Sequence, residues 1–351
     1  MSPRFRFAIA CALFSATAGG AGRAGGPDAA PGPASVDPAL PPYAPQPVAF
    51  PAGAGYLTPQ GAVSIVGYND MKDMLEALDA LFAAAHPGFR FALDLQGTRT
   101  APSALARGTS AFAPMGAEFS ADQLRDYRKS MAVDPLAIRV AHGSLSPRAK
   151  SGPILVFVHP SNPLSRITTA GMALLFASAE GNGGPVHWSR LGLGGAWADR
   201  DVHPVGLAAS TPIGDYILRE KLGAGRFRSG YRAEVQSEAV VRRVAADPSA
   251  IGFARANVLT PAVRILAVAR QPEGPWSSAS PEDVVAGKYP LDWYLYIYLR
   301  RLPGRPVDPF VREYLRLVLS REGQQAVAGT PQSYLPLNPG EAADELAKLN
   351  R

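Results

Sequence analysis

The spacing of apolar residues changes repeatedly between residues 62 and 108, and these changes predict alternating strands and helices. Residues 62–66 are a short apolar run typical of a strand. Along residues 70–85 the apolar side chains recur every three or four positions, which predicts an amphipathic helix. Residues 89–95 alternate between apolar and polar side chains, as in a strand with two unlike faces. The pattern therefore predicts a βαβ unit that leads into a short helix at residues 101–106.

Both strand-to-helix turns of this unit carry polar side chains suited to binding an anion. Asn69 and Asp70 stand at the first turn, and Thr98, Arg99 and Thr100 stand at the second. The two helix N-termini follow the carboxyl ends of neighbouring strands, so their unpaired N–H groups and positive dipole ends face the same way. Such an arrangement predicts an oxyanion site.

Strand and helix patterns continue to alternate to the end of the chain, which predicts an α/β fold. The strands are expected at residues 136–140, 154–158, 202–207, 251–253, 264–268 and 289–300. The helices are expected to begin near Ser120, Thr168, Ser210, Ser237, Asp308 and Gln324, with a last one at the C-terminus. Ser210 and Thr211 precede a proline at the first helical position, which makes this helix start a third candidate for anion binding.

Length, charge and residue content narrow the possible functions. The chain has 351 residues, enough for two domains with cores of their own, and a net charge of +6. The basic residues are dispersed, whereas nucleic-acid binding needs a basic stripe, so we expect no nucleic-acid partner. The five histidines show no metal-ligand spacing, and we predict neither a metal nor a cofactor.

The first residues have the features of a secretory signal peptide. Two arginines precede an apolar run at residues 7–14, and Ala16-Thr17-Ala18 is a small-residue cleavage site. A membrane anchor is the alternative, but the apolar run is too short to span a bilayer. Lipidation of Cys11, the single cysteine, is a weaker alternative because little apolar sequence precedes it. We therefore predict a cleaved signal peptide over residues 1–18 and a location in the periplasm.

Residues 19–59 are rich in Pro, Gly and Ala and show no apolar period. This composition predicts a flexible linker.

Five short segments between residues 162 and 337 are informative when their order along the chain is considered. They are Asn162-Pro163-Leu164, residues 247–253 (Asp-Pro-Ser-Ala-Ile-Gly-Phe), Tyr289-Pro290-Leu291, residues 320–325 (Ser-Arg-Glu-Gly-Gln-Gln) and Tyr334-Leu335-Pro336-Leu337. Taken together, they resemble the periplasmic phosphate-binding proteins that serve ABC importers, a branch of the type II solute-binding fold. The resemblance covers roughly residues 64–337. It implies two α/β lobes joined by two crossovers, with a ligand bound in the cleft between the lobes.

On this template, lobe one comprises residues 60–157 and 258–351, and lobe two comprises residues 158–257. The implied function is that of a periplasmic solute-binding protein, which binds phosphate or a related small oxyanion for the membrane subunits of an ABC importer. We expect it to act as a monomer.

The ligand motifs of that family fall here on altered residues. Its first turn corresponds to Tyr68-Asn69-Asp70, and its acid that accepts the proton of hydrogenphosphate falls on Ala111. A following arginine falls on Ala117. The resemblance implies ligand contacts from Asn69, Asp70, Thr98, Arg99, Thr100, Ser210 and Thr211. Arg99 would restore the lost positive charge, and Asp70 would accept the ligand's proton. The equally weighted alternative is that Asp70 caps its helix and Arg99 is solvated.

Other functions have different sequence requirements. A protein of the same fold with a changed or lost ligand, acting in the envelope as a sensor or interaction module, fits the altered motifs equally well. An enzyme fits less well, because the chain has no nucleophile-elbow pattern and no thiol after residue 18. We therefore predict no enzymatic activity.

Overall fold

The computed structural model describes residues 35–178, 184–302 and 304–350. The predicted signal peptide, residues 1–18, and the first part of the predicted linker, residues 19–34, lie outside these residues. The strands are β1 Val63–Val66, β2 Phe91–Asp94, β3 Ala113–Met115, β4 Leu136–His142, β5 Ile154–Val158, β6 Arg166–Thr168, β7 His203–Leu207, β8 Arg232–Glu234, β9 Ala250–Arg255, β10 Arg264–Ile265, β11 Ala267–Ala269 and β12 Tyr294–Leu299. The helices are α1 Lys72–Ala85, α2 Ala101–Arg107, α3 Ala121–Met131, α4 Thr169–Phe176, α5 Pro212–Tyr216, α6 Ser237–Ala246, α7 Pro281–Val285, α8 Pro309–Val318, α9 Arg321–Ala328 and α10 Pro339–Lys348.

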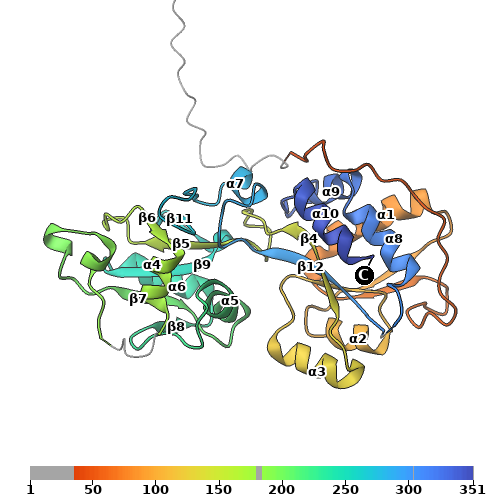
Figure 1. Ribbon diagram of the computed structural model, residues 1–351, viewed down its shortest axis with the longest axis horizontal. Helices are drawn as coiled ribbons and strands as arrows, with labels where there is room; N and C mark the ends of the chain where they lie inside the picture. Colours follow the sequence, from red (N-terminus) through yellow and green to blue (C-terminus); the bar gives the residue numbers. More distant parts are fainter. Residues whose placement is uncertain (1–34, 179–183, 303, 351) are drawn as a thin grey trace, which may run out of the picture. The chain divides into compact units, whose positions relative to one another are not determined.

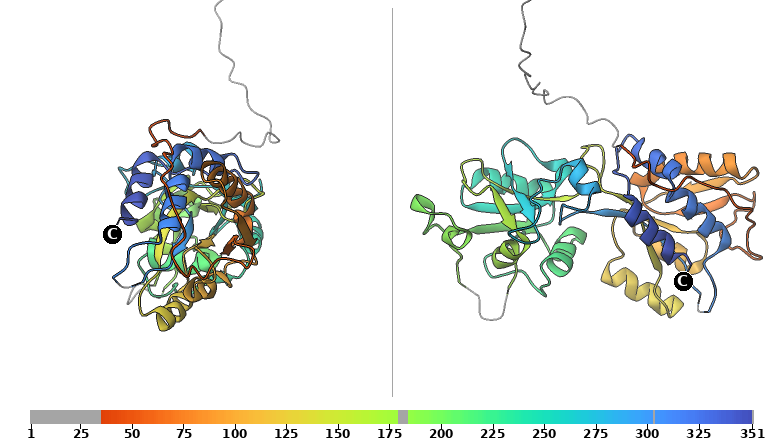
Figure 2. Two further views of the ribbon diagram at one scale, coloured as in Figure 1. Left: turned by 90° about the vertical axis from the view of Figure 1, so that its right-hand side faces the viewer. Right: turned by 45° about the horizontal axis from the view of Figure 1, so that its top comes forward.

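Lobe one is the part of the chain built around the buried cluster that includes Val63, Phe82, Ile297 and Phe310. Its β1 and β2 pair in parallel, as the predicted βαβ unit requires, and its antiparallel sheet has the order β3-β12-β4. Helix α1 buries its predicted apolar face, including Phe82, against this core. Figures 1 and 2 show α1, α8, α9 and α10 grouped together in lobe one.

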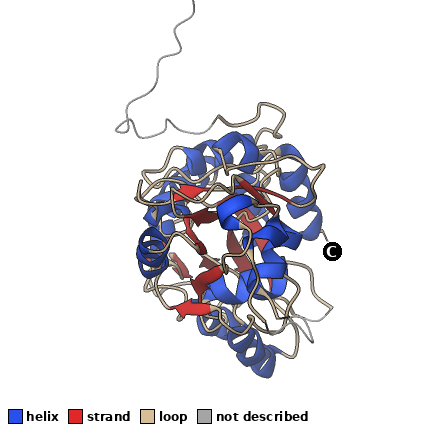
Figure 3. Ribbon diagram, turned by 90° about the vertical axis from the view of Figure 1, so that its left-hand side faces the viewer, coloured by secondary structure: helices blue, strands red, loops and turns tan. Residues whose placement is uncertain are grey.

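Lobe two is the part built around a second buried cluster, which includes Phe157, Val240 and Phe253. Its five-stranded sheet has the order β10-β5-β9-β7-β8. Every residue of β5 is buried, as its continuous apolar sequence predicts. Helix α6 packs closely on β9, where a Cβ at Gly252 would lie 2.8 Å from a methyl carbon of Val244. Figure 3 shows helices surrounding a central group of strands.

The chain passes from one buried cluster to the other twice. Both changes lie at positions other than the predicted lobe boundaries. The first change lies between Ala149 and Ile154 rather than at residue 157, because β5 pairs along its whole length with β9 of lobe two. The second lies between Trp293 and Leu295 rather than at residue 257, because β10 pairs with β5 and Leu291 packs in the second cluster. The crossovers are therefore the segments around residues 143–153 and 289–294.

Residues 35–59 are attached to lobe one and are not the free tether that their composition predicts. Leu40 is only 1% exposed, and Tyr56 is 7% exposed. The Tyr43 hydroxyl donates to Oε1 of Glu313 at 2.9 Å, and the Tyr56 hydroxyl donates to Asp308 at 2.8 Å. A few aromatic side chains are enough to anchor a Pro-rich segment that has no secondary structure of its own.

Candidate functional site

The candidate site is a cavity of about 450 Å³ lined by both lobes, which we call the interlobe cleft. Lobe one contributes the β2–α2 turn, the segment from β3 into α3, and two tyrosines of β12. Lobe two contributes the start and the end of α5 and the helical turn Ile217–Lys221 that follows it. The residues that line it are Thr98, Arg99, Met115, Ala117, Glu118, Phe119, Ser120, Ala121, Gln123, Leu124, Ser210, Pro212, Asp215, Tyr216, Arg219, Glu220, Trp293, Tyr294 and Tyr296.

The β2–α2 turn places Thr98 and Arg99 in the cleft. Gly97 has a φ of 110°, which glycine tolerates and which lets the chain turn sharply after β2. The Gln123 side chain donates to the carbonyl oxygen of Thr98 at 3.0 Å and so ties this turn to α3. Arg99 is exposed and, among the described residues, forms no ion pair. Its guanidinium is therefore available to an anionic ligand.

Thr100 does not line the cleft. Its hydroxyl donates to the carbonyl oxygen of Gly97 at 3.1 Å instead of capping α2. Pro102, within the first turn of α2, lacks an N–H group.

The start of α5 places Ser210 in the cleft, whereas Thr211 serves the helix itself. The Thr211 hydroxyl oxygen accepts from the N–H of Gly214 at 3.0 Å and donates to the carbonyl oxygen of Ala208 at 2.8 Å. A Cβ at Gly214 would lie 2.0 Å from that same carbonyl oxygen, so the tight turn requires glycine. Thr211 is thus a helix cap, while Ser210 is exposed and lines the cleft.

Asn69 and Asp70 lie outside the lining of the cleft. Asn69 is exposed, and Asp70 is 8% exposed. One carboxylate oxygen of Asp70 accepts from the N–H of Lys150 at 2.7 Å and from the hydroxyl of Tyr334. Asp70 therefore links the start of α1 to the first crossover, and its predicted role as acceptor of a ligand proton stays a prediction.

Acidic and aromatic side chains that the sequence analysis did not select make up much of the cleft. Glu118 accepts from the Tyr296 hydroxyl at 2.9 Å. On lobe two, Asp215 pairs with Arg219 at 2.5 Å one helical turn away. Burial, followed by the negative charge of Glu118, raises the pKa of Tyr296 well above its ordinary value, so this tyrosine stays a neutral donor. The alternating aromatic pattern of residues 289–300 was the available signal for Tyr296, whereas no sequence signal pointed to Glu118 or Asp215.

The second crossover forms the wall of the cleft between the lobes. The Trp293 indole N–H donates to the carbonyl oxygen of Gly116 at 2.7 Å. The Tyr216 hydroxyl donates to the carbonyl oxygen of Asp292 at 2.6 Å, and its ring meets that of Trp293 edge to face at 5.0 Å. Tyr216 belongs to α5, so these contacts join lobe two to the crossover.

A buried histidine fixes this crossover to lobe one. His142, the last residue of β4, is completely buried and lies between two carboxylates. Its Nδ1 is 2.5 Å from Asp292 and its Nε2 is 3.0 Å from Glu341 of α10. Burial by itself lowers the pKa of His142, but the two carboxylates outweigh it and raise the pKa to about 9. The imidazole is therefore a cation at neutral pH, and it positions the segment that carries Trp293.

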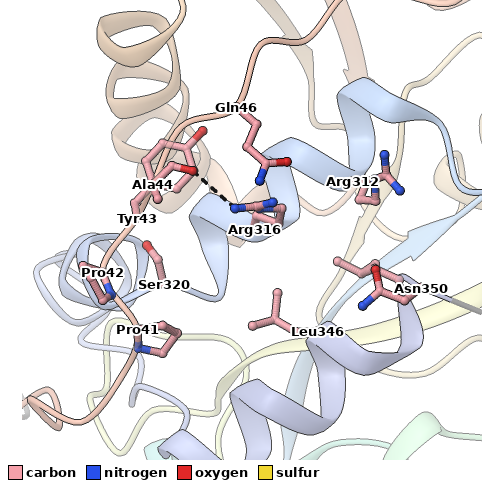
Figure 4. A pocket seen from close by; sticks show the side chains of 11 residues that line it. Pro41, Pro42, Tyr43, Ala44, Gln46, Arg312, Arg316, Ser320, Leu346 and Asn350 are labelled. Atoms are coloured by element: carbon pink, nitrogen blue, oxygen red, sulfur yellow. Dashed lines mark hydrogen bonds between the residues drawn. The ribbon is translucent and has the colours of Figure 1, made fainter.

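A second cavity, of about 440 Å³, lies beneath residues 41–46 (Figure 4). Arg312 and Arg316 of α8 line it together with Leu346 of α10. Arg316 is already bonded to the carbonyl oxygen of Ala44 at 3.3 Å and lies 3.4 Å from Glu313. All of its lining comes from lobe one and the segment attached to it, so movement between the lobes would not enclose a ligand there. The interlobe cleft is the better candidate.

Two features are absent from the described residues. None of their helices is long and apolar enough to cross a membrane. Within the same ranges, no group of three His, Cys, Asp or Glu side chains could hold a metal ion.

Comparison with known proteins places the chain beside phosphate-binding proteins. No protein-family model matches it. The phosphate-binding protein PstS of Pseudomonas aeruginosa strain PAO1 is 28% identical over 328 residues, which cover 93% of this chain and 95% of the relative. PstS of strain UCBPP-PA14 gives the same values.

Solved structures agree on the fold. PstS from Borrelia burgdorferi has a TM-score of 0.51 at 17% identity, and the match covers 79% of this chain and 99% of that one. An ABC-type phosphate transport receptor from Vibrio cholerae has a TM-score of 0.50 at 13% identity and covers 78% and 98%. The resemblance predicted from the sequence is thus confirmed, and the chain has the two-lobed α/β fold of the phosphate-binding proteins of ABC importers.

Proposed function

We propose that this protein is a periplasmic receptor that binds phosphate or a related small oxyanion in the interlobe cleft and delivers it to an ABC importer. The observation that carries the proposal is the similarity to PstS along almost the whole of both chains. The cleft supports it, because Arg99, Ser210 and the Thr98 turn can all donate to an anion. We also propose that the chain acts as a monomer in the periplasm and catalyses no reaction, as the sequence analysis predicts.

The other lining residues give a second candidate function some support. Glu118 and Glu220 place negative charge in the same cleft as Arg99. Carboxylates beside a bound dianion repel it unless a proton or a cation lies between them. A protein of the same fold with a changed ligand is therefore the alternative, and it would serve in the envelope as a sensor or interaction module.

Titration calorimetry with phosphate, sulfate, molybdate and arsenate tests the proposal. We expect saturable binding of phosphate to the purified protein. Replacement of Arg99 with alanine should weaken that binding at least tenfold, because a charge-assisted hydrogen bond contributes about 1.5–3 kcal/mol.

Arg107→Ala is the matched control for this variant. Arg107 is the exposed last residue of α2, close in sequence to Arg99 but outside the lining of the cleft. Its removal should leave affinity unchanged. If folded wild-type protein releases no heat with any of the four anions, the proposed ligand class is wrong and the alternative function stands.

A further inference from the structure

The charges of the interlobe cleft are poorly matched to a free inorganic dianion. Of the charged side chains that line it, Asp215 and Arg219 neutralise one another at 2.5 Å. Arg99 then shares the lining of the cleft with two carboxylates, those of Glu118 and Glu220. A phosphate dianion could satisfy Arg99 but would bring two more negative charges beside these groups. A ligand that carries its own positive charge would be complementary to both signs.

The cleft also offers aromatic surface to a cation. Tyr216, Trp293, Tyr294 and Tyr296 all contribute to its lining. Two of these rings already hold cationic side chains of the protein: the Lys221 ammonium lies 5.0 Å from the ring centre of Tyr216, and the Arg139 guanidinium lies 4.9 Å from that of Tyr294. Electron-rich ring faces attract ammonium groups, and quaternary ammonium ligands are commonly bound in this way.

The size of the cleft fits an organic substituent as well as an anion. Its volume of about 450 Å³ lies within the range of about 300–1,000 Å³ that is usual for pockets that bind small organic molecules. The Tyr296 hydroxyl orients Glu118 through a 2.9 Å hydrogen bond, so this carboxylate is held in place at the wall of the cleft.

From these observations we infer that the preferred ligand is a phosphate monoester of a small organic cation, such as the phosphate ester of an amino alcohol. This inference rests on the proposed function, because the phosphoryl group would occupy the oxyanion position near Arg99 and Ser210. The cationic group would lie against the aromatic rings and face Glu118 and Glu220.

Titration calorimetry with phosphocholine, glycerol 3-phosphate and inorganic phosphate tests the inference. Phosphocholine should bind at least tenfold more tightly than either of the others, because glycerol 3-phosphate has an organic group of similar size but no positive charge. Glu118→Gln keeps an acceptor for the Tyr296 hydroxyl and removes the charge. This variant should lose most of the preference for phosphocholine and bind inorganic phosphate at least as well as the wild type does.

Two controls separate the possible results. Asp126→Asn removes an exposed negative charge of α3 outside the cleft lining and should leave the preference intact. Glu220→Gln tests the second carboxylate independently if the first variant does not fold. Equal or tighter binding of inorganic phosphate by the wild type overturns this inference and leaves the proposed function standing. Equal affinity for glycerol 3-phosphate and phosphocholine overturns the role of the cation. Absence of binding by all three compounds overturns the proposed function itself.

Discussion

The two lobes differ in the kind of side chain that they bury. Lobe one and the crossovers bury Asp70, Asp79, His86, His142, Asp292, Glu313 and Glu345, whereas the buried charged residue in the described part of lobe two is Arg228. Arg228 donates to backbone carbonyl oxygens of Leu174 and Gly184. The buried groups of lobe one instead contact other ionisable side chains, and the pKa values of two of them, Asp79 and His142, are raised above their ordinary values. The comparison indicates that the stability of lobe one and of the crossovers depends on pH more strongly than the stability of lobe two does.

The largest expected effect on stability comes from His142, whose cationic imidazole lies between two carboxylates. Its pKa is raised to about 9 in the folded protein, above the ordinary value of about 6.5, so its contribution to stability is complete below about pH 6.5 and is lost as pH rises through 9. His142→Gln should lower the free energy of unfolding at pH 7 by about 3 kcal/mol, because buried carboxylates lose their cationic partner. Urea denaturation followed by tryptophan fluorescence measures this change.

The pH dependence distinguishes this role from simple packing. In the variant, the loss of stability between pH 7 and pH 10 should be much smaller than in the wild type. His203→Gln is the matched control, since His203 is exposed and pairs with an exposed Asp247 in lobe two at 2.7 Å. It should change the unfolding free energy by less than about 0.5 kcal/mol. An unchanged pH profile for His142→Gln would contradict the assignment of a charged imidazole.

A smaller effect is expected at Asp79, which belongs to the core of lobe one. Burial raises the pKa of Asp79 to about 7, although the Tyr314 hydroxyl, which donates to it at 2.7 Å, acts in the opposite direction. The folded state therefore favours the neutral acid, and the carboxyl group destabilises the protein increasingly as pH rises from about 4 through 7. Asp79→Asn should gain about 2 kcal/mol of stability at pH 8 and almost none at pH 4.

Urea denaturation at the two pH values tests this prediction. Asp344→Asn, at an exposed position of α10, is the control and should have little effect at either pH. A variant that is less stable than the wild type at pH 8 would show that Asp79 contributes through its charge.

Much of the fold could be predicted because its signals are local. The apolar periods of α1 and β2 and the helix starts at Ser120 and Thr168 all depend on neighbours in sequence, and each is present. The positions at which the buried clusters change could not be predicted, because they depend on the pairing of β5 with β9 and β10, which is a long-range choice. In the cleft, turns could be identified, but Glu118 and Tyr216 reach it only through tertiary structure. Residue type likewise could not show that Asp70 bonds to Lys150 and Tyr334, outside the cleft lining.

The smallest expected effects concern two adjacent hydroxyl groups of lobe two, those of Ser210 and Thr211. The sequence analysis predicts a ligand contact from both. Thr211 caps α5 through a 3.0 Å bond from Gly214, so Thr211→Ala should lower stability by about 1 kcal/mol and leave anion affinity nearly unchanged. Ser210 lines the cleft, so Ser210→Ala should leave stability unchanged and weaken phosphate or phosphate-ester binding about threefold, the effect of losing one modest hydrogen bond. Denaturation and calorimetry on both variants measure the four quantities. If Thr211→Ala reduces affinity more than Ser210→Ala does, the hydroxyl group that caps the helix also serves the ligand, and lobe two contributes to binding through its helix start rather than through an exposed side chain.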